Sequence, residues 1–503
     1  MATVGSRLRA ASAGVALALA AGVAGVAGSY LVAGFAPGFV VAPVESALSR
    51  AMPGAVVTYA ILVLGSLGQQ LNLLAAVAIT IALFALVAWL ASAIGRQVAA
   101  PVVGPAVAGA AVWAVATALT RDPVLALGAA VPTAAVVALP EVVARVGGSG
   151  SGTGAGSVDG GRRTALGALA GAVGFGVLSY LVGGRGGESG GGELEGTREG
   201  RTTTERLLSE ARTQSLDVAG LEPLVSEAFY EVDINSVDPQ VSAEEWSLRV
   251  TGAVEEEIEL SYDDLTSMPS EPRFVTLRCV GEGLNGKKMD NALWEVVPIA
   301  DVLDRAGLEL EQCCVMLRAA DDYYEEFPAE ALKRGYLAYG MNGRRLPRAH
   351  GHPVRALIPG HWGEINVKWL TEIEVLEREV DGYWEKRGWH GTGPVSTVAK
   401  LHVVNRLDDG RVQVAGHAYA GTRGIGRVEV STDGGSSWND ARLSEPLPGE
   451  DVWRQWAYEY DPPGEEHEVV VRAYDADGTR QPKKRRPAFP SGATGWVSRT
   501  VTP

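Results

Sequence analysis

The first third of the chain is dominated by long apolar runs, whereas the rest alternates short apolar and polar stretches. Apolar runs of membrane length cover residues 10–34, 70–95, 99–120, 123–144 and 164–183. A sixth run, 55–68, is shorter and fits either a re-entrant segment or an extension of its neighbour. The pattern therefore predicts an α-helical transmembrane bundle in the N-terminal part of the chain.

Basic residues at the ends of these runs indicate the orientation of the bundle. With five spans six of these basic residues fall on one side, which the positive-inside rule assigns to the cytoplasm. They are Arg7, Arg9, Arg96, Arg145 and the pair Arg162–Arg163. A sixth span would place the pair outside. We therefore expect about four helices within 1–146, a fifth over 164–183, and a catalytic part beyond it outside the cytoplasm.

Residues 147–163 predict a flexible cytoplasmic linker, because they are rich in Gly and Ser and end in the arginine pair. A threonine and a small-residue apolar stretch follow the pair. This arrangement fits a charged anchor at a helix end. It also fits an internal twin-arginine export signal, which serves domains that fold before they cross the membrane. The residues themselves leave both interpretations open.

Beyond a second linker over 184–215, rich in Gly, Glu, Arg and Thr, the chain becomes a mixed α and β sequence. "WSLRVTG" predicts a strand, and "IELSYDDL" predicts a strand entering a helix with Asp263 or Asp264 near its cap. "VPIADVLDRAGL" has helical spacing and ends on Gly307, and "CCVMLRAADDYYEEF" starts as a buried strand. We assign 216–398 to an α+β domain.

Residues 399–503 alternate with period two between Asp-Gly and Gly-Gly turns. That pattern is typical of a β-sandwich of immunoglobulin-like type, here without its cysteines. The segment has no cluster of catalytic residue types. It therefore indicates a packing or dimerisation module rather than a second active site.

Charge and histidine content separate the two parts further. Residues 1–183 contain eight Lys and Arg and four acids, which leaves 36 bases and 55 acids for the rest. A net-acidic surface argues against nucleic acid as a partner. All seven histidines lie beyond residue 349, so the membrane part has none to ligate a haem, and we expect it to act as an anchor.

Two features of the soluble part carry candidate chemistry. In "RFVTLRCVGEGLNG", Cys279 ends a strand and precedes a glycine-rich loop. Position alone favours an ordinary buried cysteine, although strand exits also hold functional side chains. The stretch 341–369 gathers arginines, histidines and a lysine in an acidic background, and it predicts a pocket for a phosphate-bearing ligand. With only three cysteines no disulfide framework is possible, and Cys313 and Cys314 are expected in the core.

A set of motifs in this order resembles the sulfite oxidase family of molybdopterin-dependent oxidoreductases, over about residues 216–490. The motifs are "FYEVD", "TLRC", "NALWEVVPIADVLDRAG", "LAYGMNGRRLPRAHGHPVRALIPG", "VKWLTEIEV", "GYWEKRGWH" and "GHAYAGTRGIGRVEVSTDGGSSW". The resemblance implies a sulfite-oxidase-type molybdopterin domain followed by its sandwich. It also implies a molybdenum–molybdopterin cofactor with Cys279 as the thiolate ligand, a soft donor that suits such a metal. The other residues implied to bind the cofactor are Phe229, Tyr230, Asp321, His350, Arg355, Asn366, Val367 and Lys368.

The chain departs from the family at two places. Sulfite oxidases proper follow the ligand cysteine with an Asn-Arg-Arg segment, whereas here Val280 to Leu284 contain no arginine and include Glu282. Trp389 stands where the family has an active-site tyrosine. Because Glu282 would repel a dianion, we expect a substrate other than sulfite. The cofactor is inserted inside the cell, so the resemblance also favours the twin-arginine interpretation of Arg162–Arg163.

These inferences converge on an extracytoplasmic, membrane-embedded oxidoreductase that transfers an oxygen atom to or from a small molecule. The sequence has no Cys-x-x-Cys-His haem motif, so electrons are expected to leave to a separate carrier, and the last domain to support a homodimer. The alternatives are a sulfite oxidase proper, a sulfoxide reductase, or a non-catalytic scaffold of the same fold. Retention of Cys279, His350, Arg355 and Lys368 together argues against the scaffold.

Overall fold

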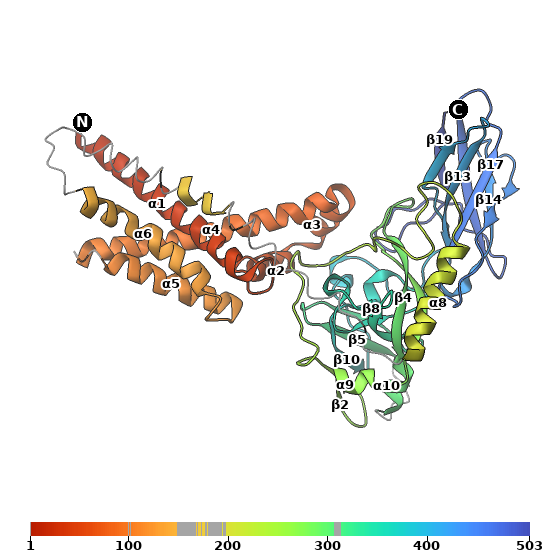
Figure 1. The fold of residues 1–503 in the computed structure, drawn as a ribbon, viewed down its shortest axis with the longest axis horizontal. Helices are drawn as coiled ribbons and strands as arrows, with labels where there is room; N and C mark the ends of the chain where they lie inside the picture. The colour runs from red at the N-terminus through yellow and green to blue at the C-terminus, as the bar shows by residue number, and fades with distance from the viewer. Residues whose placement is uncertain are drawn as a thin grey trace. The chain divides into compact units, whose positions relative to one another are not determined.

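The computed structural model describes residues 2–98, 102–147, 198–305 and 313–502, together with Ala100, Leu194 and isolated positions between 167 and 179. The chain separates into two compact units (Figure 1). The helical unit comprises Met1–Met52, Leu64–Glu188 and Asp233–Gln240. The β-rich unit comprises Pro53–Val63, Ser189–Val232 and Val241–Pro503.

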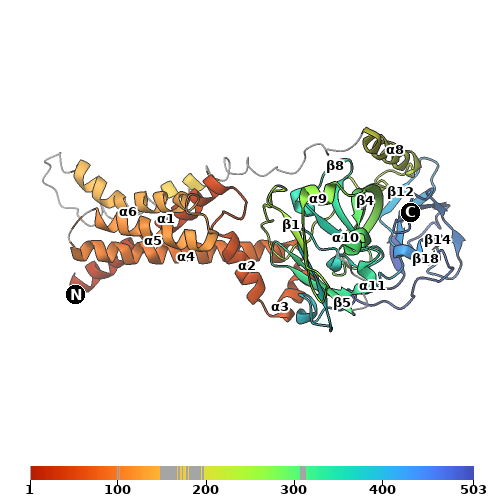
Figure 2. The ribbon, with the colours of Figure 1, turned by 90° about the horizontal axis from the view of Figure 1, so that it is seen from below.

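The helical unit is a bundle in which α1 and α5 each pack against α4 and α6 (Figure 2). Its helices are α1 (Ala2–Ala33), α2 (Ala42–Ala51), α4 (Ser66–Val98), α5 (Val103–Thr120) and α6 (Leu127–Gly147). Small residues allow close contact between helices in such bundles. A Cβ added to Gly28 would lie 2.2 Å from the carbonyl oxygen of Gly128, so the α1–α6 contact requires glycine at that point.

Among the described residues, three helices are long and apolar enough to cross a membrane, namely Ala13–Ala33, Leu67–Val98 and Val103–Thr120. The span predicted over 123–144 appears as a shorter apolar helix, Leu127–Val143. The sixth candidate forms α3 (Gly54–Tyr59) and a π-helical turn (Ala60–Leu64), bent by 107° from α2. Of the predicted fifth span, 164–183, only isolated positions are described, and the linker 148–163 with Arg162–Arg163 lies outside the described residues.

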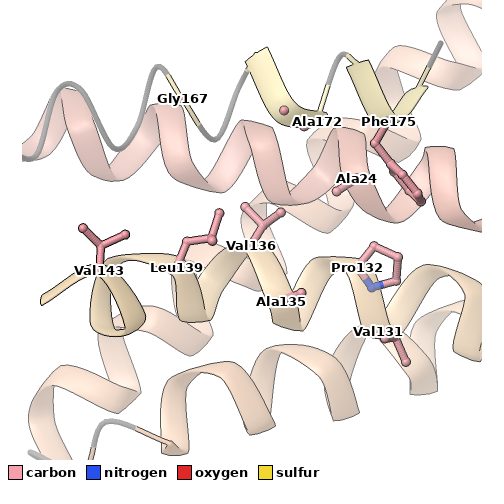
Figure 3. A pocket seen from close by; sticks show the side chains of 11 residues that line it. Ala24, Val131, Pro132, Ala135, Val136, Leu139, Val143, Gly167, Ala172 and Phe175 are labelled. Carbon is pink, nitrogen blue, oxygen red and sulfur yellow. The ribbon is translucent and has the colours of Figure 1, made fainter. Parts of the chain in front are cut away.

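An apolar groove of about 700 Å³ runs between α1, α6 and the isolated positions near Phe175 (Figure 3). All eleven lining residues are apolar, with Val131, Val136 and Leu139 contributed by α6. Because the lining has no titratable or metal-ligating side chain, the described part of the groove offers no catalytic group.

The first domain of the β-rich unit contains two five-stranded sheets. One has the order β2-β1-β10-β5-β6, with β1 and β10 parallel and the other pairs antiparallel. Its strands are β1 (Ser247–Gly252), β2 (Ile258–Ser261), β5 (Cys314–Ala319), β6 (Tyr324–Pro328) and β10 (Leu370–Leu376). The other sheet has the order β3-β4-β7-β8 with β9 paired to β7. Its strands are β3 (Glu271–Arg278), β4 (Met289–Pro298), β7 (Tyr336–Met341), β8 (Arg344–Arg345) and β9 (Arg355–Leu357).

Local signals in the sequence explain several of these elements. Ser261 and Asp264 form a capping box at the start of α9 (Tyr262–Thr266), as the acidic residues in that stretch predicted. The predicted helix after β4 is α10 (Ile299–Arg305), and its expected end at Gly307 lies outside the described residues. A short helix, α11 (Ala329–Leu332), follows β6.

The expectation that both Cys313 and Cys314 lie in the core is wrong. Cys314, the first residue of β5, is buried with the strand, whereas Cys313 is exposed because it lies before the strand, outside the sheet. The structure also joins the two sulfur atoms in a disulfide bond. One bond between adjacent residues closes no loop of the fold.

The C-terminal domain consists of two antiparallel sheets with a shared core of Val414, Val428, Trp456 and Val471. The first sheet contains β11 (Val398–Ala399), β12 (Val403–Arg406), β13 (Val412–Tyr419), β16 (Arg442–Leu443) and β17 (Arg454–Tyr460). The second contains β14 (Ile425–Ser431), β15 (Asn439–Asp440), β18 (His467–Asp475) and β19 (Val497–Val501). The two-layer arrangement fits the alternation in the sequence, and the immunoglobulin-like assignment stays a prediction.

Part of the segment expected to be a linker, 184–215, instead forms helix α8 (Arg198–Gln214). Its Leu207 and Ala211, four residues apart on one face, are buried in a cluster with Phe274 and Trp453. This cluster joins both domains of the β-rich unit, since Trp453 belongs to the C-terminal domain and its Nε1 donates to the carbonyl oxygen of Leu224 at 2.8 Å. The candidate site lies beside it.

Candidate active site

Cys279 directly follows β3, where the sequence pattern placed it, and its loop folds back on the strand. Its N–H donates to the carbonyl oxygen of Lys288 at 3.0 Å, and its carbonyl oxygen accepts the N–H of Glu282 at 3.3 Å. A Cβ on Gly363 would lie 3.6 Å from the Cα of Cys279 and 3.0 Å from the hydroxyl of Tyr230. Burial raises the pKa of the Cys279 thiol, and Lys288 acts in the opposite direction. A metal would therefore have to displace the thiol proton on binding.

Glu282 is the centre of a buried network of charges beside this cysteine. Lys400, from the C-terminal domain, donates to both carboxylate oxygens of Glu282 at 2.6 Å, and Arg278 Nε lies 3.5 Å from one of them. The side chains of Lys400 and Glu282 are 0% and 2% exposed. Burial lowers the pKa of Lys400 to about 8, while Glu282 opposes that shift. Removing one partner of such a buried pair costs about 3–5 kcal/mol.

This pairing corrects the expectation that Glu282 repels an anionic substrate. Two cations neutralise the carboxylate, and the three groups together carry a formal charge of +1. Both cations are fully buried, however, and each makes further contacts to backbone carbonyls. Arg278 also donates to the carbonyl oxygens of Ser396 and Ala493 at 3.0 and 3.3 Å, and Lys400 to that of Gly286 at 3.0 Å.

Further contacts fix the cysteine loop to the start of the C-terminal domain. Asn285 donates to the carbonyl oxygen of Leu401 at 2.9 Å and accepts the N–H of the same residue at 2.8 Å. On the outer side, Ile61 of the segment after α2 packs beside Val280, and a Cβ on Gly281 would lie 3.2 Å from it. The loop is thus held from two directions.

The basic stretch predicted to bind a phosphate-bearing ligand forms a compact group. Arg355 is buried and donates to the carbonyl oxygens of His350 and Asn366 at 3.1 and 2.9 Å. Lys368 Nζ donates to the carbonyl oxygen of Ala349 at 2.7 Å. Burial, with Arg355 and Lys368 nearby, lowers the pKa of His350 to about 3. Cationic groups and a neutral imidazole thus converge within one short segment.

The other predicted residues lie around this group. Val367 is buried, and its carbonyl oxygen accepts the N–H of Ala356 at 2.8 Å. Asp321 lies in the β5–β6 turn, which is joined to the same segment by the N–H of Ala320 donating to Trp369 at 3.0 Å. Arg344, in contrast, is exposed in the β7–β8 hairpin and stays apart from the group.

Phe229 and Tyr230 connect the cationic group to the cysteine. Their rings stack at 5.4 Å, and Phe229 also meets the ring of His350 edge-on at 5.5 Å. The Tyr230 N–H donates to Asp290 at 2.8 Å, which fixes the backbone there. Burial and the neighbouring Cys279 raise the pKa of Tyr230.

A buried acidic cluster beside the segment 382–391, which contains Trp389, was not predicted from the sequence. Glu325, Glu364 and Glu385 come from β6, a 3-10 turn (Gly363–Ile365) and a second 3-10 turn (Glu385–Arg387). Glu364 is 8% exposed, and both its oxygens are inaccessible. Burial first, and then Glu385, raise its pKa to about 8. Tyr323 links the cluster, donating to Glu325 at 3.0 Å and to the backbone oxygen of Glu364 at 2.9 Å.

Trp389 is buried next to the cysteine loop. A Cβ on Gly281 would lie 3.7 Å from its ring, and its Nε1 has no hydrogen-bond partner among the described residues. Its ring meets those of Trp384 and Phe489 edge-on at 6.2 and 5.2 Å. The position therefore offers an apolar wall with an N–H, where the family pattern has a phenol hydroxyl.

The residues fit a pterin cofactor with a thiolate-bound metal. Cys279 supplies a soft donor, and the group around Arg355 supplies a grip for an anionic tail. Two glycines allow the backbone to approach these groups closely. Gly351 has a φ of 109°, and a Cβ there would lie 3.1 Å from Arg355 and 3.0 Å from Lys368. Gly363 likewise allows the backbone to lie close to Cys279 and Tyr230.

Comparison with known proteins agrees with this fit. Residues 235–384 match the oxidoreductase molybdopterin binding domain, and residues 394–489 match the Mo-co oxidoreductase dimerisation domain. The chain thus contains the domain that binds a molybdenum–molybdopterin cofactor. It belongs to the sulfite oxidase family of molybdopterin-dependent oxidoreductases.

Individual relatives show the same relationship over part of their length. Mitochondrial sulfite oxidase of Mus musculus is 29% identical over 308 residues, which cover 50% of this chain and 56% of that protein. NADH nitrate reductase of Spinacia oleracea is 28% identical over 317 residues, covering 49% and 34%. The crystal structure of sulfane dehydrogenase SoxCD from Paracoccus pantotrophus superposes with a TM-score of 0.48 and 21% identity, covering 59% of this chain and 90% of that chain. The chain spans about half the length of the mouse relative.

The acidic cluster should make stability depend on pH. Because the folded-state pKa of Glu364 lies above its unfolded value, the folded protein holds a proton that the unfolded chain releases. Stability should therefore fall as pH rises from about 4.5 to about 8, by up to roughly 1.4 kcal/mol per pH unit from this group. We expect Glu364→Gln to flatten that fall, measured by denaturant unfolding of the β-rich unit between pH 5.5 and 8.5. Glu256→Gln, at an exposed site, serves as the control, and an unchanged slope in Glu364→Gln would contradict the assignment.

Proposed function

We propose that this chain is a membrane-anchored, extracytoplasmic oxidoreductase that carries out two-electron oxygen-atom transfer at a molybdenum ligated by Cys279. The observation that carries the proposal is the placement of Cys279 and the Arg355 group at two ends of one site, bridged by Phe229 and Tyr230. When bound, the cofactor supplies the redox chemistry and the oxygen-atom transfer. The chain binds and orients it.

The roles of individual residues follow from their surroundings. Arg355 and Lys368 provide charge for the phosphate, while His350 and Asn366 fix the backbone that Arg355 contacts. Phe229 and Tyr230 offer ring faces to the pterin. The side chain of Asp321 and the backbone of Val367 complete the proposed grip at its edges.

The charge distribution near Cys279 supports a substrate other than sulfite. The side chains of Arg278 and Lys400 are 0% exposed and both pair with Glu282, so most of their charge is balanced by that carboxylate. Trp389 contributes an apolar wall. A neutral or less charged small molecule, oxidised or reduced as a sulfoxide would be, fits this site better than a dianion.

A second candidate is a sulfite oxidase proper. The net charge of +1 on Arg278, Lys400 and Glu282 removes the repulsion that the sequence suggested, and the relatives include sulfite oxidases. An assay with sulfite separates the two candidates. A non-catalytic scaffold, the third possibility, should purify without molybdenum.

The proposed location rests on three helices with the length and composition of membrane spans, together with the arginine pair Arg162–Arg163. A cofactor that is inserted in the cytoplasm requires a folded domain to cross the membrane, which the twin-arginine route provides. Electrons would then pass to a separate carrier outside. The matched dimerisation domain supports a homodimer.

Cofactor retention should depend on Arg355 far more than on Arg344. Arg355 is buried in the proposed phosphate grip, whereas Arg344 is exposed. A charge-assisted contact contributes about 1.5–3 kcal/mol, so Arg355→Ala should weaken retention by roughly ten- to a hundredfold. Pterin content per purified chain, compared with Arg344→Ala as the matched control, measures this. Equal content in the two variants would contradict the placement of the grip.

Sulfite should be oxidised poorly by the molybdenum-loaded enzyme. Two missing charge-assisted contacts cost about 3–6 kcal/mol of transition-state stabilisation, or several powers of ten in rate. Steady-state assays with a dye acceptor should compare sulfite with sulfoxides, N-oxides and aldehydes. Cys279→Ser should abolish turnover and keep the pterin, because a hydroxyl is a poor substitute for the thiolate. Turnover of sulfite near ten per second, a typical enzyme rate, would favour the second candidate.

Export of the folded domain should require the arginine pair. In Arg162→Lys/Arg163→Lys cells we expect the first helices to insert normally and the β-rich unit to stay inside. Digestion by an external protease, followed with an antibody to the C-terminal domain, reports its location. The same degree of digestion in wild type and variant would argue for a simple charged anchor.

A further inference from the structure

A segment between β18 and β19 carries an unusual concentration of positive charge. Within the basic strap, defined as residues 482–495, Lys483, Lys484, Arg485 and Arg486 are consecutive and exposed. The whole chain has a net charge of −15. No ion pair between described residues involves any of these four side chains. They therefore form an uncompensated positive surface on an acidic protein.

Contacts within the C-terminal domain hold the strap in one conformation. The backbones of Arg486 and Thr494 exchange two hydrogen bonds, at 2.9 and 3.3 Å. Arg485 donates to Ser498 Oγ at 2.7 Å, and Lys483 lies 4.9 Å from the centre of the Trp496 ring. Since these contacts use no carboxylate, they present the charges without neutralising them.

The C-terminal half of the same strap, residues 489–493, contacts the candidate active site. Phe489 packs edge-on against Trp389 at 5.2 Å, and the carbonyl oxygen of Pro490 accepts the N–H of His390 at 2.9 Å. The carbonyl oxygen of Ala493 accepts a hydrogen bond from Arg278 at 3.3 Å. Arg278 is bonded directly to Cys279, the proposed metal ligand.

A short bonded path therefore joins the charged surface to the metal site. It runs from Arg486 across the hydrogen bonds to Thr494, along the chain to Ala493, and across one more hydrogen bond to the guanidinium of Arg278. From there it follows the Arg278 side chain and the peptide bond to Cys279. The site that would release electrons and the surface that would attract an anion are thus two ends of one structural element.

We propose that Lys483–Arg486 form the docking surface for an acidic one-electron carrier protein that exchanges electrons with the metal site through the basic strap. The proposal rests on the proposed oxidoreductase function. In the oxidative direction, one substrate molecule and one water yield the oxygenated product, two protons and two electrons. Two carrier molecules, docking in turn, each accept one of those electrons. Long-range attraction between the basic surface and an acidic carrier would speed their encounter.

Other occupants of the surface fit less well. Two copies of this chain meeting through the same surface would bring like charges together, which is unfavourable. An anionic lipid surface would satisfy the charge but would give no reason for the path to Cys279. An acidic carrier protein is therefore the occupant that fits both the charge of the surface and the path to Cys279.

The test uses the full-length holoenzyme in nanodiscs of neutral lipid, with succinylated cytochrome c as the acidic carrier and unmodified cytochrome c as the basic control. Binding affinity is measured directly. The rate at which dithionite-reduced holoenzyme reduces each carrier is measured by stopped flow, so no substrate is needed. The key variant is Lys484→Gln/Arg486→Gln, because both residues contact Thr494 through their backbones. The control is Arg378→Gln/Arg442→Gln, which removes the same charge from other exposed positions.

We expect wild type to prefer the succinylated carrier, with an affinity that falls as salt rises. Lys484→Gln/Arg486→Gln should weaken binding and slow electron transfer by about tenfold at low salt, while the control variant stays within about twofold of wild type. Equal effects in both variants, or none, would overturn the proposal. A changed oligomeric state of the key variant, measured by light scattering, would also overturn the proposal. So would competition between phosphatidylglycerol nanodiscs and the carrier that is seen for wild type and not for the key variant. Absence of molybdenum or of any oxygen-atom transfer would instead count against the proposed function, since the binding measurement does not depend on either.

Discussion

The buried pairing of Lys400 with Glu282 and Arg278 is the constraint on which the rest of the site depends. Three charged side chains lie together without solvent, so each would be strongly unfavourable without the others. Arg278 and Glu282 flank Cys279 in sequence, and Lys400 comes from the start of the C-terminal domain. The pairing therefore sets the position of the cysteine loop only when both domains are folded and docked.

Because of this pairing, the two ends of the site differ in how their charged groups are balanced. At the cysteine end the cations are occupied by Glu282 and by backbone carbonyls. At the other end, the group around Arg355 keeps its charge within a buried segment next to neutral His350. In the proposed function, one end holds the anionic cofactor tail and the other receives a substrate of low charge.

Trp389 connects the remaining features of the site. The segment of Trp389 lies beside the acidic cluster, where burial raises the pKa of Glu364 to about 8, and the Trp389 ring meets Phe489 of the basic strap. A carboxyl that holds a proton and an apolar wall thus lie near the cysteine loop. This arrangement places groups that hold protons close to a site whose chemistry releases or consumes them.

The sequence by itself determined much of the local structure and the composition of the site. Alternation and a glycine-rich loop placed Cys279 at the exit of β3, Asp263 and Asp264 indicated the start of α9, and the basic stretch gathered His350, Arg355 and Lys368. These features depend on neighbours close in the chain, so a local pattern is enough to reveal them. The motifs between residues 229 and 438 were also sufficient to identify the family. They did not fix the substrate or the membrane topology.

Only the tertiary structure decided the state of the charged groups. The sequence suggested that Glu282 repels anions. Its partner Lys400 lies 118 residues away in the chain, so no local pattern reveals the pairing. Glu325, Glu364 and Glu385 come from separate elements, and each resembles a surface acid in its own segment. Helix α8 arose in a stretch that looked like a linker because its apolar face finds a partner only in the folded core. Burial and long-range pairing determine the charge and pKa of a side chain, and neither is encoded in the residues next to it.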